Sequence, residues 1–320
     1  MIKRRGLFVV QAAVTVALLV FLFRGFDWQL LSEILQRLTP VFYLGSFAAV
    51  ASGQLLYVWR WHTVLSGMGL RVPFGDVFRQ YFVGLFFSSL MPSAVGGDAA
   101  KVFYLGRRVG YMQAGASVLA DRFLGFAWLS MLGATLAWTV GGHTPMIVLN
   151  RQLLTVAAAG FVLALALLWL LPIDRLVPSF LRVPKLSRPI AAFERLAGHL
   201  QAGCCRPRTV AVSGLVALSY IALLSVIYLK YFEASGAVSP GPLATMNVVV
   251  STAVFVNVPV TVGGVGLREQ LHFLLFGELG IVKETAVSVS LLVYGYALVL
   301  SLGGYLIWLR LKPSTRPATI

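Results

Sequence analysis

Long uninterrupted hydrophobic runs dominate the pattern of this chain, and short polar segments separate them. A helix rises about 1.5 Å per residue, so about 20 apolar residues are needed to cross a hydrocarbon core of roughly 30 Å. Because the runs are continuous rather than alternating, they predict membrane-spanning helices and not the strands of a membrane β-barrel. We expect six spans, at about 7–23, 41–58, 114–140, 153–171, 209–229 and 285–308.

Two further hydrophobic runs are too short to cross, and each ends at a proline that is followed by glycines. The runs are 77–91 and 246–258, which as helices cover only about 22 Å and about 20 Å. Proline removes a helical hydrogen bond and glycine permits sharp turns, so both runs should end inside the membrane. We predict two re-entrant hairpins of broken helices, at about 77–108 and 246–277, buried in protein or lining a wet cavity.

The two helix breaks share one spacing, Pro-x-x-x-Gly-Gly-x-x-x-basic. The residues of the breaks are Pro92, Gly96, Gly97 and Lys101 in the first copy and Pro259, Gly263, Gly264, Gly266 and Arg268 in the second. Two broken, charged hydrophobic segments in corresponding positions of two halves are the best sequence indication of a transporter binding site.

The spans and hairpins form two halves of opposite topology. Each half reads span, span, hairpin, span, but the first hairpin enters from the inside and the second from the outside. The first repeat is 1–140, and the second consists of span 4 in 141–171, a basic loop at 172–208, and 209–310. This order predicts an all-α, polytopic membrane protein with an inverted-topology repeat in a single membrane domain, 1–320.

The distribution of charge orients this arrangement. The chain is 58% hydrophobic, with a mean hydropathy of +0.85 and a formal net charge of +15. Most Lys and Arg residues fall in the termini and the inner loops, 172–208 above all, which the positive-inside rule assigns to the cytoplasm. We therefore expect an inner-membrane protein with cytoplasmic termini and an uncleaved first span. Two amphipathic segments, 27–38 and 190–201, are candidate surface helices.

Composition argues against several other classes of protein. The basic residues lie mostly in loops, where they set topology and touch anionic lipid, so we expect no nucleic-acid partner. The four histidines are scattered, no Walker loop is present, and the neighbours Cys204 and Cys205 show neither metal-ligand nor disulfide spacing. We therefore expect no metal and no cofactor.

Charged residues inside the predicted membrane region are the candidate binding residues. A helix that begins at mid-membrane presents unpartnered N–H groups that attract anions. Asp98 is placed to cap the first half-helix, Lys101 adds a positive charge, and Arg268 can hold a phosphate with two parallel hydrogen bonds. The full candidate set is Asp98, Lys101, Asp121, Arg122, Arg268 and Glu269.

Two interpretations of the intramembrane pair Asp121-Arg122 stay open. The pair is either a structural ion pair that holds the third span to a neighbour or part of a substrate pathway. Arg60 lies between Trp59 and Trp61 at the expected cytoplasmic end of the second span. That aromatic setting predicts an anchor at the membrane interface.

Three motifs carry a resemblance to a known family: Leu90-Met-Pro-x-x-x-Gly-Gly-Asp-x-x-Lys101, Asp121-Arg122 and Pro259-x-x-x-Gly-Gly-x-Gly-x-Arg-Glu269. Over nearly the whole chain they resemble the lysylphosphatidylglycerol synthase transmembrane family. This flippase-like domain occurs alone in many bacterial proteins and is fused to an aminoacyltransferase in multiple peptide resistance factors. The resemblance implies export or flipping of polar-headed lipids across the cytoplasmic membrane. Lys101 stands where the family usually has arginine and Asp121 where it has glutamate, and both keep the charge.

Three functions compete on this sequence. The leading one is a flippase or transporter for an anionic or zwitterionic phospholipid or a polyprenyl-phosphate sugar. The alternative is a membrane-embedded enzyme, a glycosyltransferase or phosphatase, which would need acid, base or nucleophile groups at one membrane face. The third is a structural partner. Only about a dozen residues follow 308, so we expect no lipid aminoacylation by this chain. The oligomeric state is open, and a homodimer is compatible with the sequence.

Overall fold

The computed structural model describes residues 2–90, 95–170, 187–257 and 261–311. The described chain is all-α and contains no strand, which confirms the expected fold class. Pro92 and Pro259 lie outside the described residues. The helices are α1 (Ile2–Phe23), α2 (Trp28–Arg37), α3 (Pro40–Gly67), α4 (Phe74–Leu90), α5 (Val95–Val109), α6 (Tyr111–Thr139), α7 (Pro145–Leu170), α8 (Ser187–Cys204), α9 (Pro207–Ser235), α10 (Pro242–Phe255), α11 (Leu267–Gly277) and α12 (Lys283–Arg310), with a 3-10 turn, η3 (Val262–Gly264), before α11.

Within the described residues, the helices α3, α7, α9 and α12 are each long and apolar enough to cross a membrane. They contain four of the six expected spans. The other two fall in α1 and α6. The segment Val10–Phe23 of α1 passes the test together with α2, from which it is bent by 82°. Helix α6 has the length, at 29 residues, but Asp121 and Arg122 interrupt its apolar run.

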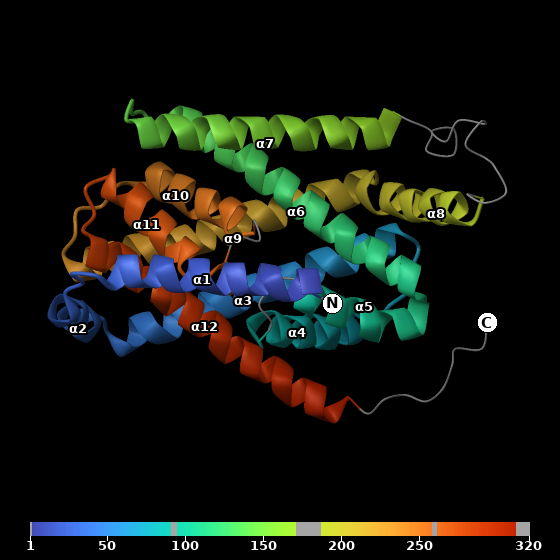
Figure 1. The fold of residues 1–320 in the computed structure, drawn as a ribbon, viewed down its shortest axis with the longest axis horizontal. Coiled ribbons are helices and arrows are strands. Elements are labelled where there is room, and N and C mark those ends of the chain that lie inside the picture. The colour runs from blue at the N-terminus through green and yellow to red at the C-terminus, as the bar shows by residue number, and fades with distance from the viewer. Residues whose placement is uncertain (1, 91–94, 171–186, 258–260, 312–320) are drawn as a thin grey trace.

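Local sequence signals begin several of these helices. Proline at the first helical position starts α3, α9 and α10, where its missing N–H costs nothing because the first N–H groups of a helix have no partner. Asp27 caps α2 by accepting hydrogen bonds from the backbone N–H groups of Gln29 and Leu30. The amphipathic helices α2 and α8 lie at opposite ends of the bundle (Figure 1). Helix α8 extends the surface helix expected at 190–201 in both directions.

The first hairpin is a pair of tightly packed short helices. Helices α4 and α5 have 17 and 15 residues, so they cover about 26 Å and about 22 Å. A Cβ atom on Gly97 would lie 1.9 Å from Ser88 Oγ and 2.3 Å from the carbonyl oxygen of Gly84, so only glycine fits where the helices cross. Because α5 begins at Val95, Asp98 lies in its first turn and is not its N-cap, contrary to the sequence expectation.

The second hairpin uses its glycines differently. Gly263, Gly264 and Gly266 have φ angles of 61°, 79° and 82°, in the left-handed region that favours glycine. Gly96 and Gly97, which occupy the matching positions of the first copy, are instead helical. The matching glycines of the two copies therefore differ in backbone conformation, although the residue spacing is the same.

The two hairpins pack across the molecule. Helix α4 packs against α12, and α10 packs against α6, whereas α5 and α11 each pack against the helix that follows them in the chain, α6 and α12. Helices α3 and α9 pack against each other in the middle of the bundle.

Candidate functional site

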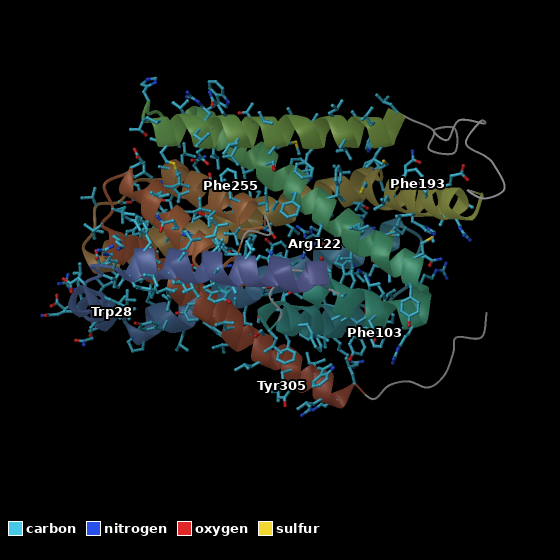
Figure 2. All side chains as sticks on the ribbon, in the orientation of Figure 1. Trp28, Phe103, Arg122, Phe193, Phe255 and Tyr305 are labelled. Carbon is cyan, nitrogen blue, oxygen red and sulfur yellow. The ribbon has the colours of Figure 1, made fainter. Side chains whose placement is uncertain are left out.

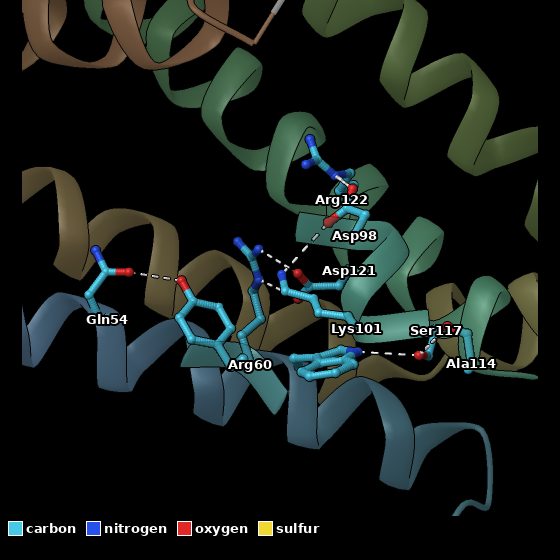
Figure 3. A network of polar contacts seen from close by, with 10 residues as sticks. Gln54, Arg60, Asp98, Lys101, Ala114, Ser117, Asp121 and Arg122 are labelled. Atoms are coloured by element: carbon cyan, nitrogen blue, oxygen red, sulfur yellow. Dashed lines mark hydrogen bonds and ion pairs between the residues drawn. The ribbon is translucent and has the colours of Figure 1, made fainter. Parts of the chain in front are cut away.

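A charged network joins the first hairpin to helix α6 (Figure 3). Arg122 Nε donates to Asp98 Oδ2, and Lys101 Nζ lies 3.7 Å from the other oxygen of the same carboxylate. Arg122 lies in the middle of the bundle, whereas Trp28 and Phe193 lie toward its ends (Figure 2). Asp98 is therefore shared by two cations from two helices, and this site carries excess positive charge.

Lys101 is held by aromatic rings as well as by Asp98. Its ammonium lies 4.8 Å from the ring centre of Tyr81 and 5.5 Å from that of Trp61. Tyr81 in turn donates a hydrogen bond of 2.9 Å to Gln54 Oε1. Asp98 and the two rings thus hold the Lys101 ammonium on three sides.

Asp121 forms a buried, two-point ion pair with Arg60 of α3. Arg60 Nε and Nη2 donate to the two carboxylate oxygens at 2.7 Å and 2.9 Å. The interface anchor expected for Arg60 is wrong, since its side chain is only 8% exposed. Gly125 makes room for the guanidinium, because a Cβ there would lie 2.8 Å from Arg60 Nη1. Asp121 and Arg122 thus have separate partners on different helices.

Arg268 occupies the first turn of α11, on the second hairpin. Its guanidinium carbon lies 4.6 Å from the ring centre of Tyr294. Within the described ranges no carboxylate lies within ion-pair distance of it. Its neighbour Glu269 is 1% exposed and accepts a 2.8 Å hydrogen bond from the N–H of Gly266, with Ser290 Oγ 3.4 Å from the other oxygen. Glu269 caps the helix, while Arg268 keeps its hydrogen-bond donors available.

Both hairpins line one cavity of about 900 Å³, called the large cavity below. Asp98 and Ser88 come from the first hairpin, and Gly263, Gly264 and Arg268 come from the second. Arg122 adds a third element. Described residues of both hairpins therefore line a common space.

Two smaller cavities adjoin the large one. The lysine cavity, of about 240 Å³, is lined by Lys101 and by both members of the Arg60–Asp121 pair. The tyrosine cavity, of about 320 Å³, is reached by Arg268. Asn257, two residues before Pro259, lines all three. The tyrosine cavity takes its name from Tyr57, Tyr220, Tyr228 and Tyr294.

The charged residues that line these cavities are four basic and two acidic, a formal net charge of +2. They are Arg60, Lys101, Arg122, Arg268, Asp98 and Asp121. The remaining wall of the large cavity is mainly apolar, and low local dielectric strengthens each charge there. Such an enclosure suits an anionic group attached to an apolar body.

The candidate residues from the sequence divide into two groups. Those that line the cavities are Asp98, Lys101, Asp121, Arg122, Gly263, Gly264 and Arg268. Glu269 and Gly266 form the helix cap instead, and Gly97 serves helix packing. Sequence reasoning missed Arg60 and Asn257, although the position of Asn257 just before a proline break was a usable signal.

Comparison with known proteins places the chain in a family. Its relatives include a UPF0104 membrane protein from Pyrococcus horikoshii, 26% identical over 87% of this chain and 89% of the relative. A UPF0104 membrane protein from Methanothermobacter thermautotrophicus is 30% identical over 49% of this chain and 46% of its own length. No solved structure matches. The family model described as the lysylphosphatidylglycerol synthase TM region matches residues 8–304. The chain belongs to the lysylphosphatidylglycerol synthase transmembrane family.

Proposed function

We propose that this protein moves a polar-headed, phosphate-containing lipid across the cytoplasmic membrane. The observation that carries the proposal is the large cavity. Arg268 lines it without a carboxylate partner in the described chain, and the Asp98–Arg122 ion pair lines the same cavity. An arginine fork forms two charge-assisted hydrogen bonds with a phosphate. A membrane lipid is a ligand that can bring a phosphate group into a cavity inside a membrane protein.

The walls of the large cavity support a lipid rather than a free phosphate. Phe103, Tyr111 and Leu119 line it and are also about half-exposed on the surface of the bundle. In a membrane, an opening with such walls faces acyl chains. The head group can then enter beside the two arginines while its tails stay in the bilayer, so that little apolar surface meets water.

The packing of the hairpins supports transport through an inverted-topology repeat. We propose that α1–α6 and α7–α12 are the two repeats. The first helix of each hairpin then packs against the last span of the other repeat, α4 against α12 and α10 against α6. Rocking one repeat against the other would open the shared cavity to each side of the membrane in turn.

We propose transport without chemical change of the lipid. In the cavities, the described carboxylates of Asp98 and Asp121 are engaged by Arg122, Lys101 and Arg60. Because their oxygens already contact these cations, the two carboxylates are poorly placed to take a proton from a substrate. These residues are better suited to hold a head group than to cleave one.

Reconstitution tests the proposal. Purified protein in liposomes should speed the redistribution of an acyl-labelled phospholipid between leaflets at least tenfold above protein-free vesicles, which corresponds to an activation barrier lower by about 1.4 kcal/mol or more. Recovered lipid should have an unchanged mass. No acceleration for any phosphate-containing lipid would rule out transport, and a cleaved or elongated lipid would favour the enzyme.

We further propose that both termini and the 172–208 segment are cytoplasmic. Cys204 is 1% exposed, and burial raises the pKa of its thiol to about 12, so it should react slowly near neutral pH. Half-buried Cys205 should be the labelled residue. A membrane-impermeant maleimide should therefore label permeabilised cells but not intact ones. Cys205→Ser should abolish the signal and Cys204→Ser should keep it. Labelling of Cys205 in intact cells would show that this segment faces the outside and would contradict the proposed orientation.

A further inference from the structure

The tyrosine cavity is lined by hydroxyl groups that the protein itself does not use. Within the described chain, the hydroxyls of Tyr57, Tyr220 and Tyr294 make no hydrogen bond with another residue. Thr252 is 4% exposed, and its Oγ1 also lacks a partner there. A buried hydroxyl without a partner destabilises the protein, because it has lost its hydrogen bonds to water. Thr252 is the buried case. The three tyrosines are only partly buried, and their hydroxyls are further donors and acceptors open to a ligand with hydrogen-bonding groups of its own.

The charge of the tyrosine cavity restricts that ligand. Arg268 reaches into it, and none of the described lining residues is acidic. The carboxylates of the neighbouring cavities are already paired with cations. An ammonium group that entered this cavity would find no carboxylate to pair with, so it would lose its hydration without gaining a counter-charge from the protein.

The shape and surface of the cavity fit an uncharged polar group. Its volume of about 320 Å³ lies at the lower end of the range for small-ligand sites, roughly 300–1,000 Å³. The rings of Tyr57 and Tyr220 lie 4.6 Å apart, centre to centre, and form one wall. Tyrosine combines an apolar ring face with a polar hydroxyl, and a polyol likewise presents both C–H and O–H surface. The lysine cavity is less suitable, because its charged groups already bind one another.

We infer that the lipid phosphate held by Arg268 carries an uncharged, hydroxyl-rich group, such as glycerol, inositol or a sugar, and that this group enters the tyrosine cavity. Arg268 lines both the large cavity and the tyrosine cavity, so one guanidinium can hold the phosphate between the acyl chains and the polyol. The inference rests on the proposed function and names its substrate class. Lipids with a cationic head group are then poor substrates.

The test compares lipids that differ only in their head groups. Acyl-labelled phosphatidylinositol and phosphatidylglycerol should redistribute at least tenfold faster in proteoliposomes than acyl-labelled phosphatidylethanolamine or lysylphosphatidylglycerol, because a site built for hydroxyl groups rejects ligands that leave it unpaired. The double variant Tyr220→Phe/Tyr294→Phe keeps both rings. It should lower the phosphatidylinositol rate at least fivefold and leave the phosphatidylethanolamine rate unchanged. Tyr305→Phe, on α12 outside the three cavities, is the matched control.

Binding separates failure of the inference from failure of the proposed function. Native mass spectrometry of the purified protein should detect preferential binding of phosphatidylinositol over phosphatidylethanolamine. Equal transport of all four lipids would overturn the inference and leave the proposed function standing. If none of the lipids moves, the proposed function fails; preferential binding of the hydroxylated lipids would still support the polyol site, and equal binding would overturn it.

Discussion

Arg268→Gln is expected to lower the rate of lipid transport at least tenfold while leaving expression near normal. Each lost charged hydrogen bond to the phosphate costs about 1.5–3 kcal/mol, and a factor of ten in rate needs only about 1.4 kcal/mol. Folding should survive, because the guanidinium makes one cation–π contact, with Tyr294, and no ion pair in the described chain. The measurement is leaflet redistribution of labelled lipid in proteoliposomes of matched protein content.

The companion variants separate charge from hydrogen-bond geometry. Arg268→Lys should keep part of the activity, because an ammonium supplies the charge but not the two-point grip. Arg151→Gln is the matched control. Arg151 lies on α7 away from the three cavities, and its guanidinium carbon lies 4.5 Å from the ring centre of Trp138, a contact similar to that of Arg268. Transport by Arg268→Gln protein at the wild-type rate would remove Arg268 from the pathway.

Asp121→Asn is expected to lower folded yield and thermal stability strongly. The substitution leaves the Arg60 guanidinium buried with a neutral partner in place of its carboxylate. Breaking a buried ion pair by removing one partner costs about 3–5 kcal/mol. Arg60→Gln should be similarly harmful, because it strands Asp121 instead. Thermal unfolding in detergent and the monodisperse fraction on gel filtration measure the effect.

The double variant Arg60→Gln/Asp121→Asn should recover much of the loss, because no buried charge remains in it. The exposed pair Lys230–Glu233 offers a control, since Glu233→Gln should change stability by less than about 1 kcal/mol. If each single variant is as stable as the wild type, the pair has no structural role. If the double variant is no more stable than the single variants, the loss of stability does not come from an unpaired buried charge.

The sequence predicted the all-α membrane class because membrane insertion imposes simple length and polarity rules. Four expected spans coincide with α3, α7, α9 and α12, and the two runs too short to cross became the broken hairpins. The second copy of the Pro/Gly spacing contains Gly263, Gly264 and Arg268, which line the large cavity together with Asp98 from the first hairpin. A charged residue beside a break in an apolar run almost always faces the protein interior or a water-filled cavity, because exposure to lipid is costly.

Pairing between distant residues lay beyond sequence reasoning. Arg60 and Asp121 are 61 positions apart, and the aromatic setting of Arg60 matched an interface anchor equally well. The tyrosines of the third cavity come from α3, α9 and α12 with no shared motif. The identical residue spacing also did not reveal that the two breaks have different backbone conformations. Gly97 is needed where the helices cross, whereas Gly263 is needed for its positive φ.

Blocking the junction of the three cavities tests most directly whether lipid passes through them. Asn257 is exposed and lines all three, so Asn257→Cys in a Cys204→Ser/Cys205→Ser background places one thiol at the junction. This variant should transport lipid until a bulky maleimide modifies it. The rate should then fall to that of protein-free vesicles, while Arg151→Cys in the same background stays active after modification. Undiminished transport by fully alkylated Asn257→Cys protein would contradict the account.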